Sequence, residues 1–96
     1  MRKDTEVLAN FLSRIESDTR IHTRHISLFI AIWQKSAETK AGVVHFFSYE
    51  LMPRSKISSY STFHKSLKEL DTYGYLSYRP SFNHNCRSHV EFNTNK

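Results

Sequence analysis

Residues 58–76 read SSYSTFHKSLKELDTYGYL, and this stretch decides the fold. Its main apolar side chains recur at i, i+4 and i+7, the spacing of a helix face that belongs in a core: Phe63, Leu67 and Leu70. We expect Ser58 to cap this helix and the helix to run to about Tyr73. Gly74 then suits the position after the last turn, where a left-handed backbone is needed. The stretch therefore predicts one amphipathic helix with a defined start and end.

The other side of this helix carries small hydroxyls and positive charge. Its residues are Ser61, Thr62, Lys65 and Lys68. A basic helix with small side chains in its N-terminal half suits insertion into the major groove of DNA. Solvated lysines are also common on helix surfaces, and first-turn hydroxyls also bond free backbone amides. Residues 58–73 contain no Arg, Asn or Gln, which argues against strict base reading by this helix.

A short strand and a short helix are predicted before this stretch. Val43–Phe47 is an apolar run of strand type, and Ser48 is the expected cap of the helix that follows it. Pro53 disfavours the α conformation at Met52, so we expect that helix to be short. Residues 54–57 then form the turn that leads into the long helix.

Two alternating segments after Gly74 predict a hairpin. Tyr75–Arg79 is the first strand, and Pro80 places the end of that strand at a sheet edge, because proline cannot donate to a ladder. Residues 81–88 form the polar tip, and His89–Asn93 is the return strand.

The N-terminal segment predicts a first, separate helix. Asp4 is its expected cap, and residues 17–19 end it. Its apolar face consists of Val7, Leu8, Phe11, Leu12 and Ile15. This helix either packs on its own domain or contacts a second copy of the chain.

A second helix is expected to start with Thr23 as its cap and to run to about Glu38. It is apolar around most of its girth, which indicates the central helix of the core. Its main stripe is Ile26, Phe29, Ile30 and Trp33, widened by Leu28 and Ile32. We expect Trp33 to be a core anchor.

Length and charge limit the functions to be considered. The 96 residues suffice for one domain with a modest core, and the net charge of +5 favours an anionic partner. Residues 54–96 carry seven basic and three acidic side chains, whereas residues 1–20 carry four of each. The positive excess therefore lies on the long helix and the hairpin.

Membrane association is not expected from this sequence. The longest apolar run is Leu28–Trp33, far short of the roughly 20 residues that cross a bilayer. The first ten residues lack the apolar run of a signal peptide. We therefore expect a cytoplasmic protein.

No cofactor and no catalysis are expected. Cys86 is the single cysteine, which excludes an internal disulfide and a Cys-rich zinc module. His84, Cys86 and His89 match no common zinc-ligand spacing. His22 and His25 have the i, i+3 spacing that can share one ion on a helix, but they straddle the expected cap, so their geometry is poor. No nucleophile has an evident partner base. A polar hairpin tip and a helix start account for these residues without a metal.

The order helix, strand, helix, turn, helix, strand, tip and strand resembles the winged helix-turn-helix family over about residues 23–93. LKELDTYGYL, residues 67–76, is similar to the family's end of the recognition helix and entry to the wing. The resemblance implies an α+β fold with a three-helix core, a small antiparallel sheet and an extra N-terminal helix. The expected division is residues 1–20 for that helix and 21–96 for the winged-helix domain.

Three shorter segments carry a narrower resemblance. IHTRHI (21–26), WQ (33–34) and YSTFHKSLKEL (60–70) are similar to small winged-helix proteins on bacterial conjugative or mobilizable elements, especially in Bacteroidetes. Those proteins are regarded as candidate regulators, which implies a small regulator or an accessory factor of a mobile element.

The family resemblance also implies a DNA-binding surface for double-stranded DNA. The helix of residues 58–73 would enter the major groove, and the wing of residues 81–88 would hold the backbone or minor groove. The helix contributes Ser59, Ser61, Thr62, Lys65 and Lys68. The turn contributes Arg54 and Lys56, and the wing contributes Arg79, Asn83, His84, Asn85 and Arg87. A homodimer through the first helix would address two half-sites.

Two other functions remain open for the same fold. A winged helix that binds another protein would show weak, sequence-blind DNA binding and an exposed apolar patch. A winged-helix part of a replication initiator would bind origin repeats. The positive excess after residue 53 favours the regulator.

Overall fold

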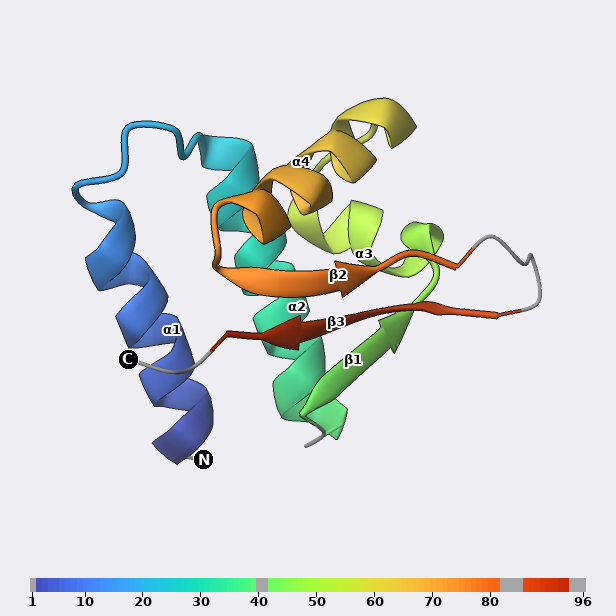
Figure 1. Ribbon diagram of the computed structural model, residues 1–96. Helices are drawn as coiled ribbons and strands as arrows, with labels where there is room; N and C mark the ends of the chain where they lie inside the picture. Colours follow the sequence, from blue (N-terminus) through green and yellow to red (C-terminus); the bar gives the residue numbers. More distant parts are fainter. Residues whose placement is uncertain (1, 40–41, 82–85, 94–96) are drawn as a thin grey trace.

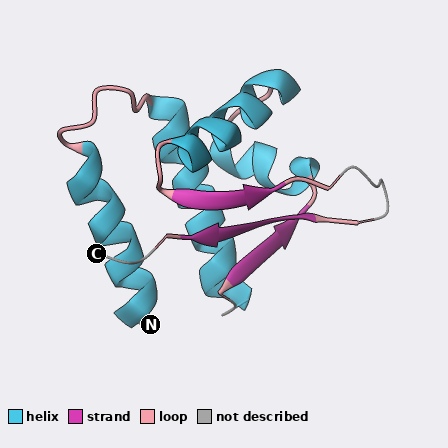
Figure 2. Ribbon diagram, viewed as in Figure 1, coloured by secondary structure: helices cyan, strands magenta, loops and turns pink. Residues whose placement is uncertain are grey.

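The helices and strands follow the predicted order, with shifts of one or two residues at several ends. The computed structural model describes residues 2–39, 42–81 and 86–93. Its elements are α1 (Arg2–Ile15), α2 (Thr23–Thr39), β1 (Val43–Phe46), α3 (Ser48–Ser55), α4 (Tyr60–Thr72), β2 (Leu76–Arg79) and β3 (Ser88–Phe92). Figure 1 shows their arrangement and Figure 2 separates helices from strands by colour.

The three strands form one antiparallel sheet in the order β1-β3-β2. β3 is the central strand, with Val90 opposite Val44 on one side and opposite Tyr78 on the other. These three side chains are buried on the inner face, as are Phe46 and Leu76. β2 is an edge strand, as Pro80 predicted. The alternation of buried and exposed residues therefore gives the sheet one face toward the helices and one outer face.

Helix α2 is the central helix, but its buried face is rotated from the predicted stripe. The buried residues are His25, Leu28, Phe29, Ala31, Ile32 and Ser36. Ile30 is 39% exposed, and Trp33 is only half-buried. The prediction of Trp33 as a core anchor was therefore wrong. Ile32 and Leu28, expected only to widen the stripe, are fully buried and centre it.

Helix α1 packs on the domain through an aromatic contact. The Phe11 ring stacks on Phe29 with 3.7 Å between centroids and 4° between planes. The Tyr75 ring meets Phe11 edge-on at 5.3 Å. Phe11 is 2% exposed, whereas its neighbour Leu12 is 41% exposed. The structure therefore shows that α1 packs on its own domain, which is the first of the two predicted alternatives.

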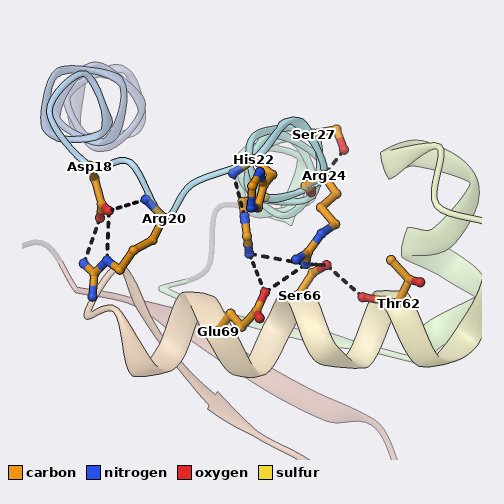
Figure 3. Close-up of polar contacts among 9 residues, drawn as sticks. Asp18, Arg20, His22, Arg24, Ser27, Thr62, Ser66 and Glu69 are labelled. Atoms are coloured by element: carbon orange, nitrogen blue, oxygen red, sulfur yellow. Dashed lines mark hydrogen bonds and ion pairs between the residues drawn. The ribbon is translucent and has the colours of Figure 1, made fainter.

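The turn between α1 and α2 is tied to the end of α4 by charged and aromatic groups. Asp18 accepts hydrogen bonds from the Arg20 guanidinium at 2.8 and 2.9 Å and from the Tyr75 hydroxyl at 2.5 Å. The Arg20 and Tyr75 hydrogen bonds lower the pKa of Asp18, while burial and the Asp18 hydrogen bond raise the pKa of Tyr75 to about 12. Arg20 also lies over the Tyr73 ring. Figure 3 shows the Asp18–Arg20 pair.

The starts of the first three helices are displaced from their predicted positions. α1 begins at Arg2, so Asp4 lies inside the helix and not at the position before its first residue. α2 begins at Thr23, and the residue before it is held by a hydrogen bond from the His22 N–H to His25 Nδ1 at 2.8 Å. The N-cap of α3 is Phe47, whose N–H donates to the Glu50 carboxylate, so Ser48 is already helical. In α2 and α3, the side chain of the third helical residue, His25 or Glu50, thus accepts the backbone N–H that precedes the helix, in place of the expected hydroxyl cap.

The start of α4 and the turn before it also differ from expectation. Ser59, one residue after Ser58, is the N-cap, and its hydroxyl accepts the Thr62 N–H at 3.3 Å. α3 is short as predicted, yet it continues through Met52 and Pro53. Its C-cap is Lys56, whose φ of 63° is left-handed. A lysine there costs backbone energy that glycine would avoid.

The fold is that of a winged helix-turn-helix with an extra N-terminal helix. α2, α3 and α4 form the three-helix core, and the β2–β3 hairpin is the wing. Gly74, with φ of 88°, ends α4 in the predicted left-handed position. Within the described ranges, no helix combines the length and the apolar character needed to cross a membrane.

Candidate nucleic-acid interface

Helix α4 meets a different surrounding on each of its sides. The core side is buried and consists of Phe63, Ser66, Leu67 and Leu70. One flank faces α2 and the other faces β2. The remaining side is exposed, and its residues at i, i+4, i+7 and i+11 are Ser61, Lys65, Lys68 and Thr72. The contacts on the two flanks therefore decide which residues α4 offers to a partner.

The flank toward α2 is held by an ion pair with hydrogen bonds on both sides. Arg24 Nη1 donates to Glu69 Oε1 at 2.9 Å and to Ser66 Oγ at 2.8 Å. Ser66 Oγ in turn donates to the Thr62 carbonyl at 2.7 Å. Figure 3 shows Arg24 reaching from α2 to Ser66 and Glu69 on α4. Thr62, expected near bases, is half-buried at this flank and does not belong to the exposed side.

A buried histidine completes this flank. His25 Nδ1 accepts the His22 N–H, so the ring proton lies on Nε2, which donates to Glu69 Oε1 at 2.7 Å. Burial lowers the pKa of His25, and the hydrogen bond to Glu69 offsets only part of that effect. Burial acts to raise the pKa of Glu69, but hydrogen bonds from His25 and Arg24 bring it below its ordinary value. A neutral histidine and an ionised glutamate therefore join α2 to α4 at neutral pH.

The flank toward β2 is held by His64 and Asp71. His64 Nε2 lies 3.1 Å from the Ser48 hydroxyl, and its Nδ1 lies 3.2 Å from the Tyr78 hydroxyl. Asp71 Oδ2 accepts the Tyr78 N–H at 2.9 Å. Burial and then the charge of Lys68 lower the pKa of His64. These bonds fix the rotation of α4 against α3 and the wing.

The exposed side of α4 borders a shallow cavity of about 600 Å³. Its lining includes Tyr60, Ser61, Lys65, Lys68, Thr72 and Tyr73. Tyr60 is 65% exposed, and its ring lies 4.3 Å from that of His64. Tyr60 therefore lies outside the core, because the core side of α4 begins three residues later with Phe63.

The predicted phosphate-binding cations fall into two groups. Within the described parts of the chain, Lys56, Lys65, Lys68 and Arg79 are exposed and form no ion pair. Arg54 instead forms two hydrogen bonds of 3.1 Å to Glu38, and Arg87 lies 3.4 Å from Glu50. The lysines of α4 can therefore meet a phosphate directly, whereas the two arginines must leave a carboxylate first.

The wing residues do not all lie beside α4. Arg87, next to β3, places its guanidinium over the Phe47 ring at 4.6 Å, which keeps it near the start of α3. Arg79 lies on the outer face of the sheet, opposite His89 in the β2–β3 register. Asn83, His84 and Asn85 lie outside the described residues. The structure thus brings Arg87 toward the helix-turn-helix and leaves Arg79 on another face.

The predicted hydroxyls of the α4 start stand at the helix end. Ser59 is the cap, and its Oγ lies 3.2 Å from Ser61 Oγ. Ser61 is exposed on the same side as Lys65. Ser59 is therefore committed to the backbone, while Ser61 stays available to a partner.

The predicted DNA-binding set leaves out three ring-bearing residues of α3 and α4. Tyr49 is 70% exposed in the first turn of α3 and stacks on Phe47. Tyr60 and His64 border the exposed side of α4. The i, i+4 spacing of Tyr60 and His64 was the available signal, since it places both rings on one flank.

Comparison of the chain with protein-family models, with curated proteins and with solved structures found no match.

Proposed function

We propose that this protein binds double-stranded DNA as a small transcription regulator or an accessory factor of a mobile element. The exposed side of α4 would lie in the major groove, and the wing would hold the adjacent backbone. Such a protein would act in the cytoplasm, on the nucleoid. The observation that carries this proposal is the pair Lys65 and Lys68, exposed on α4 beside Ser61 and without ion pairs among the described residues.

The arrangement supports binding more strongly than sequence discrimination. Lysine attracts phosphate as a point charge and can reach guanine, and serine reads bases only weakly. To bind phosphates, Arg54 and Arg87 would have to break their ion pairs with Glu38 and Glu50. The loss of these ion pairs offsets part of the electrostatic gain from the phosphates. We therefore expect affinity to be set by the backbone and to fall steeply with salt.

The test is fluorescence anisotropy against genomic duplex fragments over a range of salt concentrations. The double variant Lys65→Gln and Arg87→Gln should weaken binding more than tenfold at low salt, because it removes two cations proposed to contact phosphates. Each lost phosphate contact should also reduce the slope of log affinity against log salt by about 0.9. Arg14→Gln, which removes one exposed charge from α1 and lies outside the predicted DNA-binding set, is the control and should leave the slope unchanged. An unaltered affinity in the double variant would refute the site.

Wild-type protein that binds no duplex even at low salt would refute the function itself. That outcome favours the protein-binding winged helix, whose apolar contacts would come from exposed aromatic residues such as Tyr49 and Tyr60. Binding confined to repeated origin-like fragments would favour the replication initiator.

The proposal includes a homodimer through α1. Leu12, exposed next to the buried Phe11, is the apolar residue that a second copy would cover. Two α4 helices would then face half-sites about one helical turn apart. Leu12→Asp should convert a dimer to a monomer in light scattering without unfolding it, because this side chain is outside the core. Wild type that is already monomeric at high concentration would exclude the dimer.

A further inference from the structure

Two histidines on the outer face of the sheet are direct partners across neighbouring strands. His45 on β1 and His89 on β3 are opposite each other in the register, and their ring centroids are 5.4 Å apart. They line one shallow cavity of about 280 Å³ with Val43, Ser77, Arg79 and Glu91. This cavity is separate from the side of α4 proposed to bind DNA, because its residues belong to the face turned away from the helices.

The ring nitrogens of this pair are free to act as ligands. His45 and His89 make no hydrogen bond within the described part of the chain. His25 and His64, in contrast, use both ring nitrogens, and His25 is also fully buried. A metal ion needs an imidazole nitrogen that makes no other bond, so His25 and His64 are excluded as metal ligands.

The separation of the two rings suits one shared ion. With metal–nitrogen bonds of about 2.0–2.1 Å and a tetrahedral angle, two ligating imidazoles have centroids about 5 Å apart. The observed 5.4 Å needs only small side-chain adjustments. Imidazole prefers zinc, copper and nickel ions to magnesium or calcium. We propose that His45 and His89 together bind one divalent transition-metal ion of this class.

The surroundings fix how strong such a site can be. Within the described residues, no group of three or more His, Cys, Asp and Glu is placed to hold an ion, so water completes the coordination. Arg79, opposite His89, opposes a bound cation, while Glu91 on the same face attracts it. The site is therefore a two-histidine chelate that exchanges its ion and differs from a closed structural centre.

A bound ion would connect β1 to β3. β1 follows α2 in the chain and β3 is the return strand of the wing, so the ion joins segments 44 residues apart in sequence. Because it binds the paired strands and not the unfolded chain, it would stabilise the fold by mass action.

Isothermal titration calorimetry of the full chain with Ni²⁺ and Zn²⁺ tests the site. We expect one ion per chain and at least tenfold weaker binding in His45→Ala and in His89→Ala, since either change reduces a chelate to one ligand. Both side chains lie on the surface face, so the variants should fold. His22→Ala and Cys86→Ser are the controls and should keep wild-type affinity.

Substoichiometric Cu²⁺ in an NMR titration provides a second readout. Paramagnetic broadening should centre on residues 43–46 and 88–91. Absent binding, equal affinity in all variants, or a loss of affinity in Cys86→Ser as large as in His89→Ala would each overturn the proposal. None of these results depends on whether the protein binds DNA.

Discussion

Phe11→Ala is expected to lower the free energy of unfolding by about 3–5 kcal/mol, the usual cost of removing a buried phenyl ring. The ring is 2% exposed, stacks on Phe29 and meets Tyr75 edge-on, so its loss leaves a cavity between α1 and α2. A change of that size is a large part of the stability of a domain of this length. Urea denaturation measures it.

Leu12→Ala is the matched control for Phe11→Ala. It truncates the apolar side chain of the next residue to the same methyl group, but Leu12 is 41% exposed, and we expect a cost below about 1 kcal/mol. A large cost for Phe11 alone means that α1 unfolds with the rest of the domain. Equal small costs would mean that residues 1–20 form an appendage, as the expected division at residue 20 suggests.

His25→Ala is expected to cost about 2–4 kcal/mol and to reduce the acid sensitivity of the protein. The substitution removes the acceptor of the His22 N–H and the donor to Glu69, and it leaves a small cavity. The neutral form of the ring is the one that fits, because protonation would place a hydrogen on Nδ1, where the His22 N–H already donates.

The pH dependence follows from the direction of the shifts. Because burial lowers the pKa of His25, the unfolded chain takes up a proton at about pH 6.5 while the folded chain does not. Stability is therefore highest above that pH and falls as the pH drops through the window down to the lower folded pKa. Glu69 acts in the same direction below about pH 4.5, because its folded pKa is also lowered.

Unfolding free energies measured between about pH 7 and pH 5 check this prediction. The slope should be shallower in His25→Ala but should not vanish, since the lowered pKa of His64 contributes in the same sense. A wild-type stability that does not change over this range would contradict the role of both histidines.

Local signals in the sequence predicted the fold well. The i, i+4, i+7 stripe of α4 and Gly74 depend on backbone geometry within a few residues, and the structure confirms both. Helix caps were less certain, since serine and threonine hydroxyls compete with longer side chains. Glu50 and His25 hold the residues before α3 and α2 from inside each helix, which cap preferences do not reveal.

Features that depend on distant contacts could not be read from the sequence. The rotation of α2 is set by its packing against α1, α3 and α4. Because α2 is apolar on most of its sides, its sequence alone did not show which stripe is buried. Arg54 and Arg87 looked like free cations because Glu38 and Glu50 are 16 and 37 residues away. His45 and His89 become neighbours only through the sheet register.

The bond from the Tyr78 N–H to Asp71 has a consequence for association between chains. An edge strand with free amides is a template on which a strand of another molecule can add, and this is a common route to aggregation. On β2 one such amide is already occupied by a carboxylate from α4, and the following Pro80 has no N–H to offer. Strand addition at this edge would have to displace a charged group of the helix itself. The contact that orients α4 therefore also hinders strand addition at the edge of the wing.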